Sequence, residues 1–170
     1  MQNAKDHHFV VLVVEDDPND VTLVGVAARN CKAPIQFHFV KDGDETIAYM
    51  TGQNQFANRS KHPLPQLIVL DLQIPRRDGF QVLKWLRTQP HLRNLQVVVW
   101  TGWEHPDAQD RARQAGADLF LRKPDEAAGW TNFIGMITLA LERRMPAELA
   151  HPPMPPTLQN FNANRRLLRG

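Results

Sequence analysis

The amino-acid sequence predicts an α/β protein built on a doubly wound, five-stranded parallel sheet with helices on both faces. Five short, nearly continuous apolar runs alternate with segments whose apolar residues recur at helical spacing. Continuous apolar runs are typical of parallel strands buried on both faces, and the intervening helices supply the two covering layers. The 170 residues, 42% of them hydrophobic, are enough for one domain with a full core.

The first two strands are predicted at residues 9–14 and 35–40. The first reads FVVLVV, and the second, IQFHFV, is rich in β-branched and aromatic residues. Between them, residues 16–31 are predicted to form a helix, whose apolar face consists of Leu23, Val24, Ala27, Ala28 and Cys31. The pair Asp42-Gly43 indicates a turn, and residues 46–50 then form a short helix.

The third strand is predicted at residues 67–70, where four apolar residues, LIVL, follow one another. A polar stretch at residues 51–64 precedes it and is expected to be a surface loop, longer than most connections. After the strand, residues 79–88 are predicted to be helical because Val82, Leu83 and Leu86 share one face.

The last two strands are predicted at residues 97–100 and 118–122. The helix expected between them, at residues 105–116, has an apolar face made only of alanines. A final helix is expected to begin near Asp125, an acceptable N-cap. Its large apolar residues are Trp130, Phe133, Ile134, Ile137 and Leu141.

We expect one domain at residues 9–144, an arm at residues 1–8 and a tail at residues 145–170. The periodicity stops after the final helix, and the tail begins with the proline-rich MPAELAHPPMPP. Such composition predicts an extended or disordered segment. Its arginines, Arg165, Arg166 and Arg169, are too few and too close together to indicate binding to nucleic acid.

Composition also bears on where the protein works. No apolar run approaches the roughly 18 residues that would span a bilayer, and the polar start does not resemble a signal peptide. The single cysteine excludes an internal disulfide and fits a reducing compartment. We therefore expect a cytoplasmic protein that does not act at a membrane.

Polar side chains follow the predicted strands at their carboxyl ends, where open parallel sheets bind their ligands. Glu15 and Asp16 follow the first strand and Asp71 the third, whereas Thr101 and Lys123 follow the fourth and fifth. Carboxylates at about 4 Å repel one another by roughly 4 kcal/mol at an effective dielectric constant near 20, so three of them call for a cation. Oxygen ligands without histidine or cysteine favour Mg²⁺, and the ammonium and hydroxyl suit a phosphoryl group.

Each of these residues also has a structural interpretation. Thr101 alone would be an ordinary strand terminus, Lys123 a solvated lysine, and Asp71 the cap of a turn. Asp17 is expected to cap the helix that follows it, because Pro18 favours a helix start. The functional interpretation depends on the whole set meeting at one edge of the sheet.

Four segments in order, VVEDDP, VLDLQIPRRDG, VVWTGW and AGADLFLRKP, resemble the successive motifs of receiver domains of two-component response regulators. The resemblance covers roughly residues 9–144. It implies the flavodoxin-like strand order 2-1-3-4-5 and phosphorylation of an aspartate. The continuation of the acidic motif as PND and the long loop before the third strand resemble the single-domain receivers that partner bacterial phytochromes.

The resemblance assigns the residues of the site. Asp71 matches the phosphoacceptor, and Glu15 and Asp16 match the acidic pair. Mg²⁺ would be held by Asp16, by Asp71, by the backbone carbonyl of Gln73, and by Glu15 through water.

Three further positions match the switch of the family. Thr101 matches the switch hydroxyl, Phe120 the aromatic switch residue and Lys123 the lysine that pairs with the phosphate. Pro124 matches a proline that follows a cis peptide bond. One departure is Trp103, a bulky residue expected near the path of the hydrolytic water.

The predicted function is that of a single-domain response regulator that accepts a phosphoryl group from a phosphohistidine of a histidine kinase or phosphotransfer protein. It is not an enzyme beyond its own phosphotransfer and dephosphorylation. Its output, and a homodimer, would use the surface of the fourth helix, fifth strand and fifth helix. One alternative is an interaction module that needs no phosphorylation. A second is a Mg²⁺-dependent aspartyl phosphatase, disfavoured because Gln73 stands where that class needs an acid.

Overall fold

The computed structural model describes residues 9–103 and 105–143. The arm predicted at residues 1–8 and the tail predicted at residues 145–170 lie outside the described residues. The predicted domain, residues 9–144, is described almost throughout, so the fold and the polar edge of the sheet can be compared with expectation.

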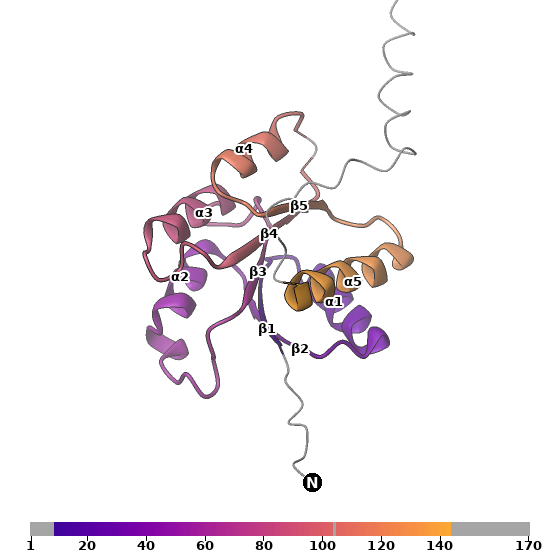
Figure 1. Ribbon diagram of the computed structural model, residues 1–170, viewed down its shortest axis with the longest axis horizontal. Coiled ribbons are helices and arrows are strands. Elements are labelled where there is room, and N and C mark those ends of the chain that lie inside the picture. Colours follow the sequence, from indigo (N-terminus) through magenta and orange to yellow (C-terminus); the bar gives the residue numbers. More distant parts are fainter. Residues whose placement is uncertain (1–8, 104, 144–170) are drawn as a thin grey trace, which may run out of the picture.

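Five parallel strands form one sheet in the order β2-β1-β3-β4-β5, which confirms the predicted fold class and order (Figure 1). The strands are β1 (Phe9–Val14), β2 (Ile35–Val40), β3 (Leu67–Leu70), β4 (Gln96–Thr101) and β5 (Leu119–Arg122). All five strands run in the same direction, but the chain adds β2 on one side of β1 and then β3, β4 and β5 on the other side, so the order of addition reverses between β1 and β3. That reversal is the switch point at which ligands bind in folds of this class.

Helices cover both faces of the sheet, with α1 and α5 on one face and α2, α3 and α4 on the other (Figure 1). The helices are α1 (Pro18–Cys31), α2 (Gly43–Thr51), α3 (Gly79–Thr88), α4 (Ala108–Gln114) and α5 (Ala127–Arg143), with a short 3₁₀ turn at Asn54–Phe56. Each face has its own apolar core, because successive residues of every strand point to opposite sides.

Helix boundaries differ from the predicted ones where capping decides them. Helix α1 begins at Pro18 because the Asp17 side chain accepts a hydrogen bond of 2.8 Å from the Asn19 N–H. Helix α2 begins three residues earlier than predicted, since Asp42 accepts from the Glu45 N–H at 2.8 Å and caps a helix instead of making a free turn.

The prediction for the apolar face of α1 was partly wrong. Val24 and Ala27 are buried, but the side chain of Leu23 is 40% exposed. Helix α4 is shorter than predicted and is anchored by the buried Ala108 and Ala112. No helix in the described ranges is long and apolar enough to cross a membrane.

Candidate functional site

The polar residues predicted from the strand ends meet at the carboxyl edge of the sheet. In the parallel register Val14 pairs with Leu70, and Leu70 pairs with Val99. The residues that follow β1 and β3, Glu15 and Asp71, are therefore neighbours across the edge. Both acids are buried although both are charged types, with relative exposures of 3% and 4%.

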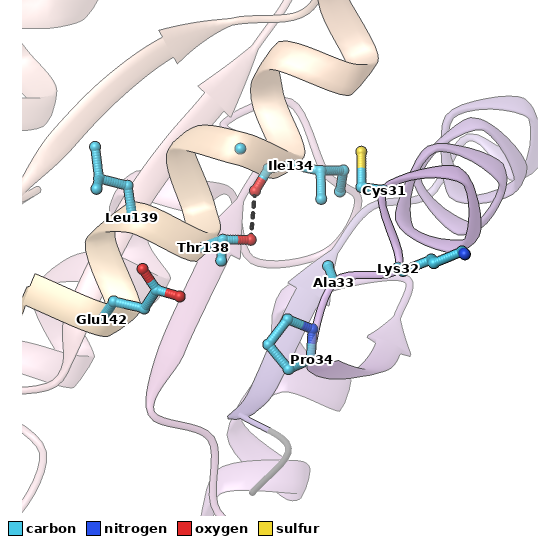
Figure 2. Close-up of a pocket in the computed structure, with 9 residues that line it drawn as sticks. Cys31, Lys32, Ala33, Pro34, Ile134, Thr138, Leu139 and Glu142 are labelled. Atoms are coloured by element: carbon cyan, nitrogen blue, oxygen red, sulfur yellow. Dashed lines mark hydrogen bonds between the residues drawn. The ribbon is translucent and has the colours of Figure 1, made fainter. Parts of the chain in front are cut away.

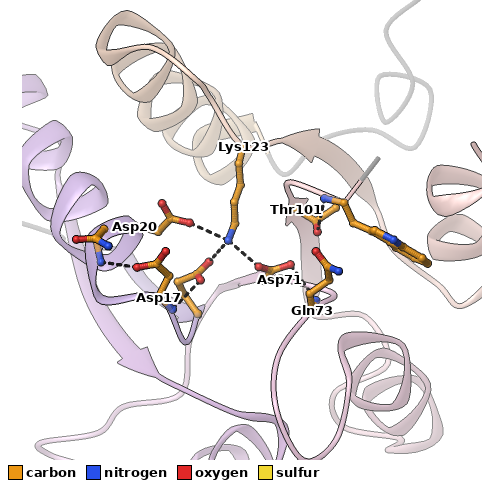
Figure 3. Close-up of polar contacts among 9 residues, drawn as sticks. Asp17, Asp20, Asp71, Gln73, Thr101 and Lys123 are labelled. Atoms are coloured by element: carbon orange, nitrogen blue, oxygen red, sulfur yellow. Dashed lines mark hydrogen bonds and ion pairs between the residues drawn. The ribbon is translucent and has the colours of Figure 1, made fainter. Parts of the chain in front are cut away.

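Lys123 lies at the centre of this edge and binds three carboxylates (Figure 3). Its Nζ is 2.6 Å from Asp71 Oδ2, 2.7 Å from Glu15 Oε2 and 2.8 Å from Asp20 Oδ2. The same Nζ lies over the Trp100 ring, 5.1 Å from its centroid. The contact with Asp71 is also a hydrogen bond in which Lys123 donates, and the indole provides an apolar floor beneath the ammonium.

Glu15, Asp16 and Asp71 form an acidic trio, in which one oxygen from each residue lies within 4.8 Å of the others. Asp16 is exposed, so the trio opens to solvent on one side. The other Asp71 oxygen, Oδ1, accepts a hydrogen bond of 3.0 Å from the Gln73 N–H, which fixes the carboxylate plane. Oxygen donors in this number and arrangement fit a hard divalent cation such as Mg²⁺.

The environment of the edge changes the ionisation of two groups. Burial raises the pKa of Glu15 from 4.5 to about 7, although Lys123 and the Asp17 N–H act in the opposite direction. Burial alone would lower the pKa of Lys123, but hydrogen bonds to Asp20, Asp71 and Glu15 outweigh it and raise that pKa. The surroundings therefore favour the charged form of Lys123. For Glu15, the cost of burying its negative charge exceeds the stabilisation that Lys123 and the Asp17 N–H provide.

Thr101 ends β4 and is completely buried. Its Oγ1 accepts a hydrogen bond of 3.2 Å from the Trp103 N–H (Figure 3). The Trp103 ring packs away from that bond, against Phe80 of α3 with centroids 6.1 Å apart, and the guanidinium of Arg111 lies 5.5 Å from the indole centroid. Phe120 is half-buried and packs on the α2, α3 and α4 side of the sheet.

The structure brings Glu15, Asp16, Asp71 and Lys123 together, with the Gln73 backbone and Thr101 bordering them. Sequence reasoning missed Asp20, which contacts Lys123 from the first turn of α1. The signal was its position three residues after the N-cap, where an acid is normally read as a favourable helix-dipole residue. The prediction of a cis peptide bond before Pro124 was wrong. The described residues contain no cis peptide bond, and trans is the more common form before proline.

A hollow of about 290 Å³ lies between α5 and the residues at the end of α1 and just after it (Figure 2). Cys31, Pro34, Leu139 and Glu142 are among the residues that line it, and Thr138 there donates a 2.9 Å hydrogen bond to the Ile134 carbonyl. It contains none of the residues of the polar edge, and its lining is mainly apolar.

The sequence profile of the response regulator receiver domain matches residues 11–131. The chain belongs to the receiver domain family. The chain is 30% identical to response regulator Rcp1 of Synechocystis over 123 residues, and this match covers 72% of the chain and 82% of Rcp1. This confirms the family inferred from the four motifs.

Solved structures of other receivers are similar to this one. The phosphorylated cyanobacterial phytochrome response regulator RcpA is 26% identical, with a TM-score of 0.72 over 82% of this chain and 97% of its own. RPA3017, a response regulator in red light signaling of R. palustris, is 29% identical, with a TM-score of 0.75 over 81% and 96%. The Mn²⁺-bound form of Rcp1 is 26% identical, with a TM-score of 0.70 over 79% and 96%.

Proposed function

We propose that this receiver is a single-domain response regulator that accepts a phosphoryl group from a phosphohistidine onto Asp71. The observation that carries the proposal is the position of Asp71 at the end of a buried strand, 2.6 Å from the Lys123 ammonium and inside the acidic trio. A rigid carboxylate between a cation site and a lysine has the geometry that phosphoryl transfer needs, since that reaction depends on positioning and charge neutralisation.

The transfer follows from the roles of these side chains. An Asp71 oxygen attacks the phosphorus, an O–P bond forms as the N–P bond to the donor histidine breaks, and the imidazole leaves. The Lys123 ammonium neutralises the phosphoryl oxygens as charge develops on them. Because the Gln73 N–H holds the other oxygen of Asp71, the nucleophilic oxygen is presented in one orientation.

Mg²⁺ is the proposed cofactor, held by Asp16, Asp71 and the Gln73 carbonyl, with Glu15 acting through water. When bound, it would neutralise negative charge on the transferring group. Two observations support this assignment: the trio offers only hard oxygen ligands, and the similar protein Rcp1 is known in a Mn²⁺-bound form.

The signal is proposed to leave the site through Thr101. Once the phosphoryl group is present, the Thr101 hydroxyl can donate to one of its oxygens, and Phe120 can move into the space that the threonine leaves. Phe120 packs against the core that contains Ala112 of α4, and α4 is short and anchored by two alanines, so the surface of α4, β5 and α5 is the part expected to rearrange. We propose that this surface also forms a homodimer.

The proposed partner is a histidine kinase or phosphotransfer protein. Similarity to RcpA and RPA3017 favours a phytochrome kinase, because the first is a phytochrome response regulator and the second acts in red light signaling. Phosphotransfer profiling against the histidine kinases of the same genome tests this. Transfer from other kinases at equal or higher rates would argue against a phytochrome.

The decisive experiment for the function is incubation with acetyl phosphate and Mg²⁺, followed by intact-mass analysis. We expect the mass of one phosphoryl group to be added, in a form that hydroxylamine removes as it does from acyl phosphates. Asp71→Asn should abolish the adduct, and Asp107→Asn, at an exposed aspartate outside the site, is the matched control. Comparable labelling of Asp71→Asn would refute the assignment and leave the phosphorylation-independent module as the better proposal.

The proposed dimer is tested separately by light scattering with and without the phosphoryl mimic beryllofluoride. We expect the mass to rise when the mimic and Mg²⁺ are both present. An unchanged mass at micromolar concentration would exclude this part of the proposal without affecting the phosphorylation of Asp71.

A further inference from the structure

Asp20 is the one carboxylate at Lys123 that has no other task in the proposed reaction. It occupies the third position of α1, and its Oδ2 is 2.8 Å from Lys123 Nζ, although its side chain remains 19% exposed. The capped helix end holds Asp20 in place, because Asp17 and Pro18 fix the first turn. Its contact with Lys123 is therefore set by the fold of α1 and does not depend on the acidic trio.

The other two partners of Lys123 are needed elsewhere. Glu15 and Asp71 belong to the trio that fits a divalent cation, and Asp20 does not. The oxygens that now bind the ammonium, Glu15 Oε2 and Asp71 Oδ2, lie on the residues that would face the metal. An ammonium shared between these two alone would compete with the cation for the same charge.

Phosphorylation increases the demand on the remaining partner. When Asp71 becomes an acyl phosphate, its carboxylate no longer exists as a free anion, and Lys123 must turn one N–H to the phosphoryl oxygens. Asp20 is not modified in the proposed reaction and stays at the same helix end, 2.8 Å from the ammonium. The Trp100 ring beneath Nζ, with its centroid 5.1 Å away, offers the ammonium no carboxylate on that side.

We propose that Asp20 is a positioning residue that draws Lys123 toward α1, so that the ammonium and Mg²⁺ can occupy the site together. This rests on the proposed function and adds to it a residue that acts through Lys123 and touches neither the metal nor the phosphoryl group. With Asp20 present, Lys123 can release Glu15 and Asp71 to the metal and keep one carboxylate partner; without Asp20, these two are the only carboxylates of the three that remain to it.

The test is a double-mutant cycle on Mg²⁺ affinity, measured by calorimetric titration of the intact chain. With Lys123 present, Asp20→Asn should weaken Mg²⁺ binding about tenfold, the size expected for one partly buried, charge-assisted hydrogen bond. With Lys123→Met the competitor is gone, so Asp20→Asn should then weaken binding by no more than about threefold, from the loss of its charge alone. Equal effects in the two backgrounds would overturn the proposal.

Asp17→Asn provides a second arm that needs no lysine variant. It removes one negative charge from the same helix end, and asparagine keeps the N-cap. We expect Asp17→Asn to weaken Mg²⁺ binding by clearly less than Asp20→Asn, and an equal loss would mean that Asp20 acts only as a nearby charge. The titrations use no phosphoryl donor, so their outcome is independent of the labelling experiment. The role of Asp20 can be refuted while acetyl phosphate still labels Asp71, and it can be supported while Asp71 is not labelled. A wild-type protein that binds no Mg²⁺ would also overturn the inference.

Discussion

Without Mg²⁺, Glu15→Gln is expected to become more stable relative to wild type as the pH rises from the acidic to the alkaline range. Glu15 is 3% exposed, and glutamine reproduces the shape of its protonated form without the charge. The Oε1 atom of Glu15 accepts a 3.0 Å hydrogen bond from the Asp17 N–H, which the amide oxygen of glutamine can also accept. The amide nitrogen then takes the place of Oε2, 2.7 Å from Lys123 Nζ, and cannot accept from it, so Lys123 keeps only Asp71 and Asp20 as partners. The part of the effect that varies with pH is the cost of holding a negative charge at Glu15.

The magnitude follows from the pKa of Glu15. Folding raises that pKa from 4.5 to about 7, so the folded state binds the proton more tightly than the unfolded state between those values. At about 1.36 kcal/mol for each pKa unit, the free energy of unfolding falls by about 3 kcal/mol as the pH rises through this window. Wild-type protein is thus most stable, in this respect, below the unfolded pKa, and the advantage is lost above about pH 7.

Urea unfolding in the presence of a chelator, at several pH values across this window, measures the effect. The free energy of unfolding of Glu15→Gln, taken relative to wild type, should rise by about 3 kcal/mol from the acidic to the alkaline end of this window. Glu142→Gln, at an exposed position on α5, is the matched control and should show no such growth.

Two results would refute the reasoning. One is a difference between Glu15→Gln and wild type that does not change with pH, and the other is a difference that moves in favour of wild type as the pH rises. Adding Mg²⁺ should reverse the order at alkaline pH, because a cation stabilises the ionised glutamate of the wild type more than the amide.

Three further predictions concern the packing around the site. Gly79→Ala should lower the free energy of unfolding in urea by about 1–3 kcal/mol and slow phosphorylation, because a Cβ there collides with the Asp71 carbonyl. The control Gly135→Ala, whose Cβ meets no atom within 4 Å, should leave the free energy of unfolding unchanged or raise it. Tyr49, the single tyrosine, should titrate by ultraviolet absorbance with a pKa of about 12, since burial raises it from 10.0; stability should fall as the pH rises through that range, and an ordinary pKa would contradict its burial. Trp103→Ala should shorten the lifetime of the phosphoryl group several-fold in a dephosphorylation assay if the indole hinders water, and an unchanged rate would exclude that role.

Much of the fold could be predicted because its signals are local. Strands β1, β2 and β3 and helix α3 have the predicted bounds. Continuous apolar runs specify β1 and β3, β-branched and aromatic residues specify β2, and helical spacing specifies the apolar face of α3. The prediction was least accurate where a side chain chooses between two local roles. Asp42 caps a helix that was expected to begin later, and Leu23 lies at the edge of an apolar face and is exposed.

The sequence alone also determined which carboxylate ends the central strand and which polar residues share its edge, because parallel strands align their carboxyl ends. Only the tertiary structure decided how the charges pair. Lys123 binds Asp20 as well as Glu15 and Asp71, and this contact joins the end of β5 to the first turn of α1, 103 residues earlier in the chain. No local sequence pattern predicts this contact. The distance between Lys123 and Asp20 depends on how α1 packs against the sheet and on how far the flexible lysine extends over Trp100. The raised pKa of Glu15 has the same origin: burial by neighbours distant in sequence sets it.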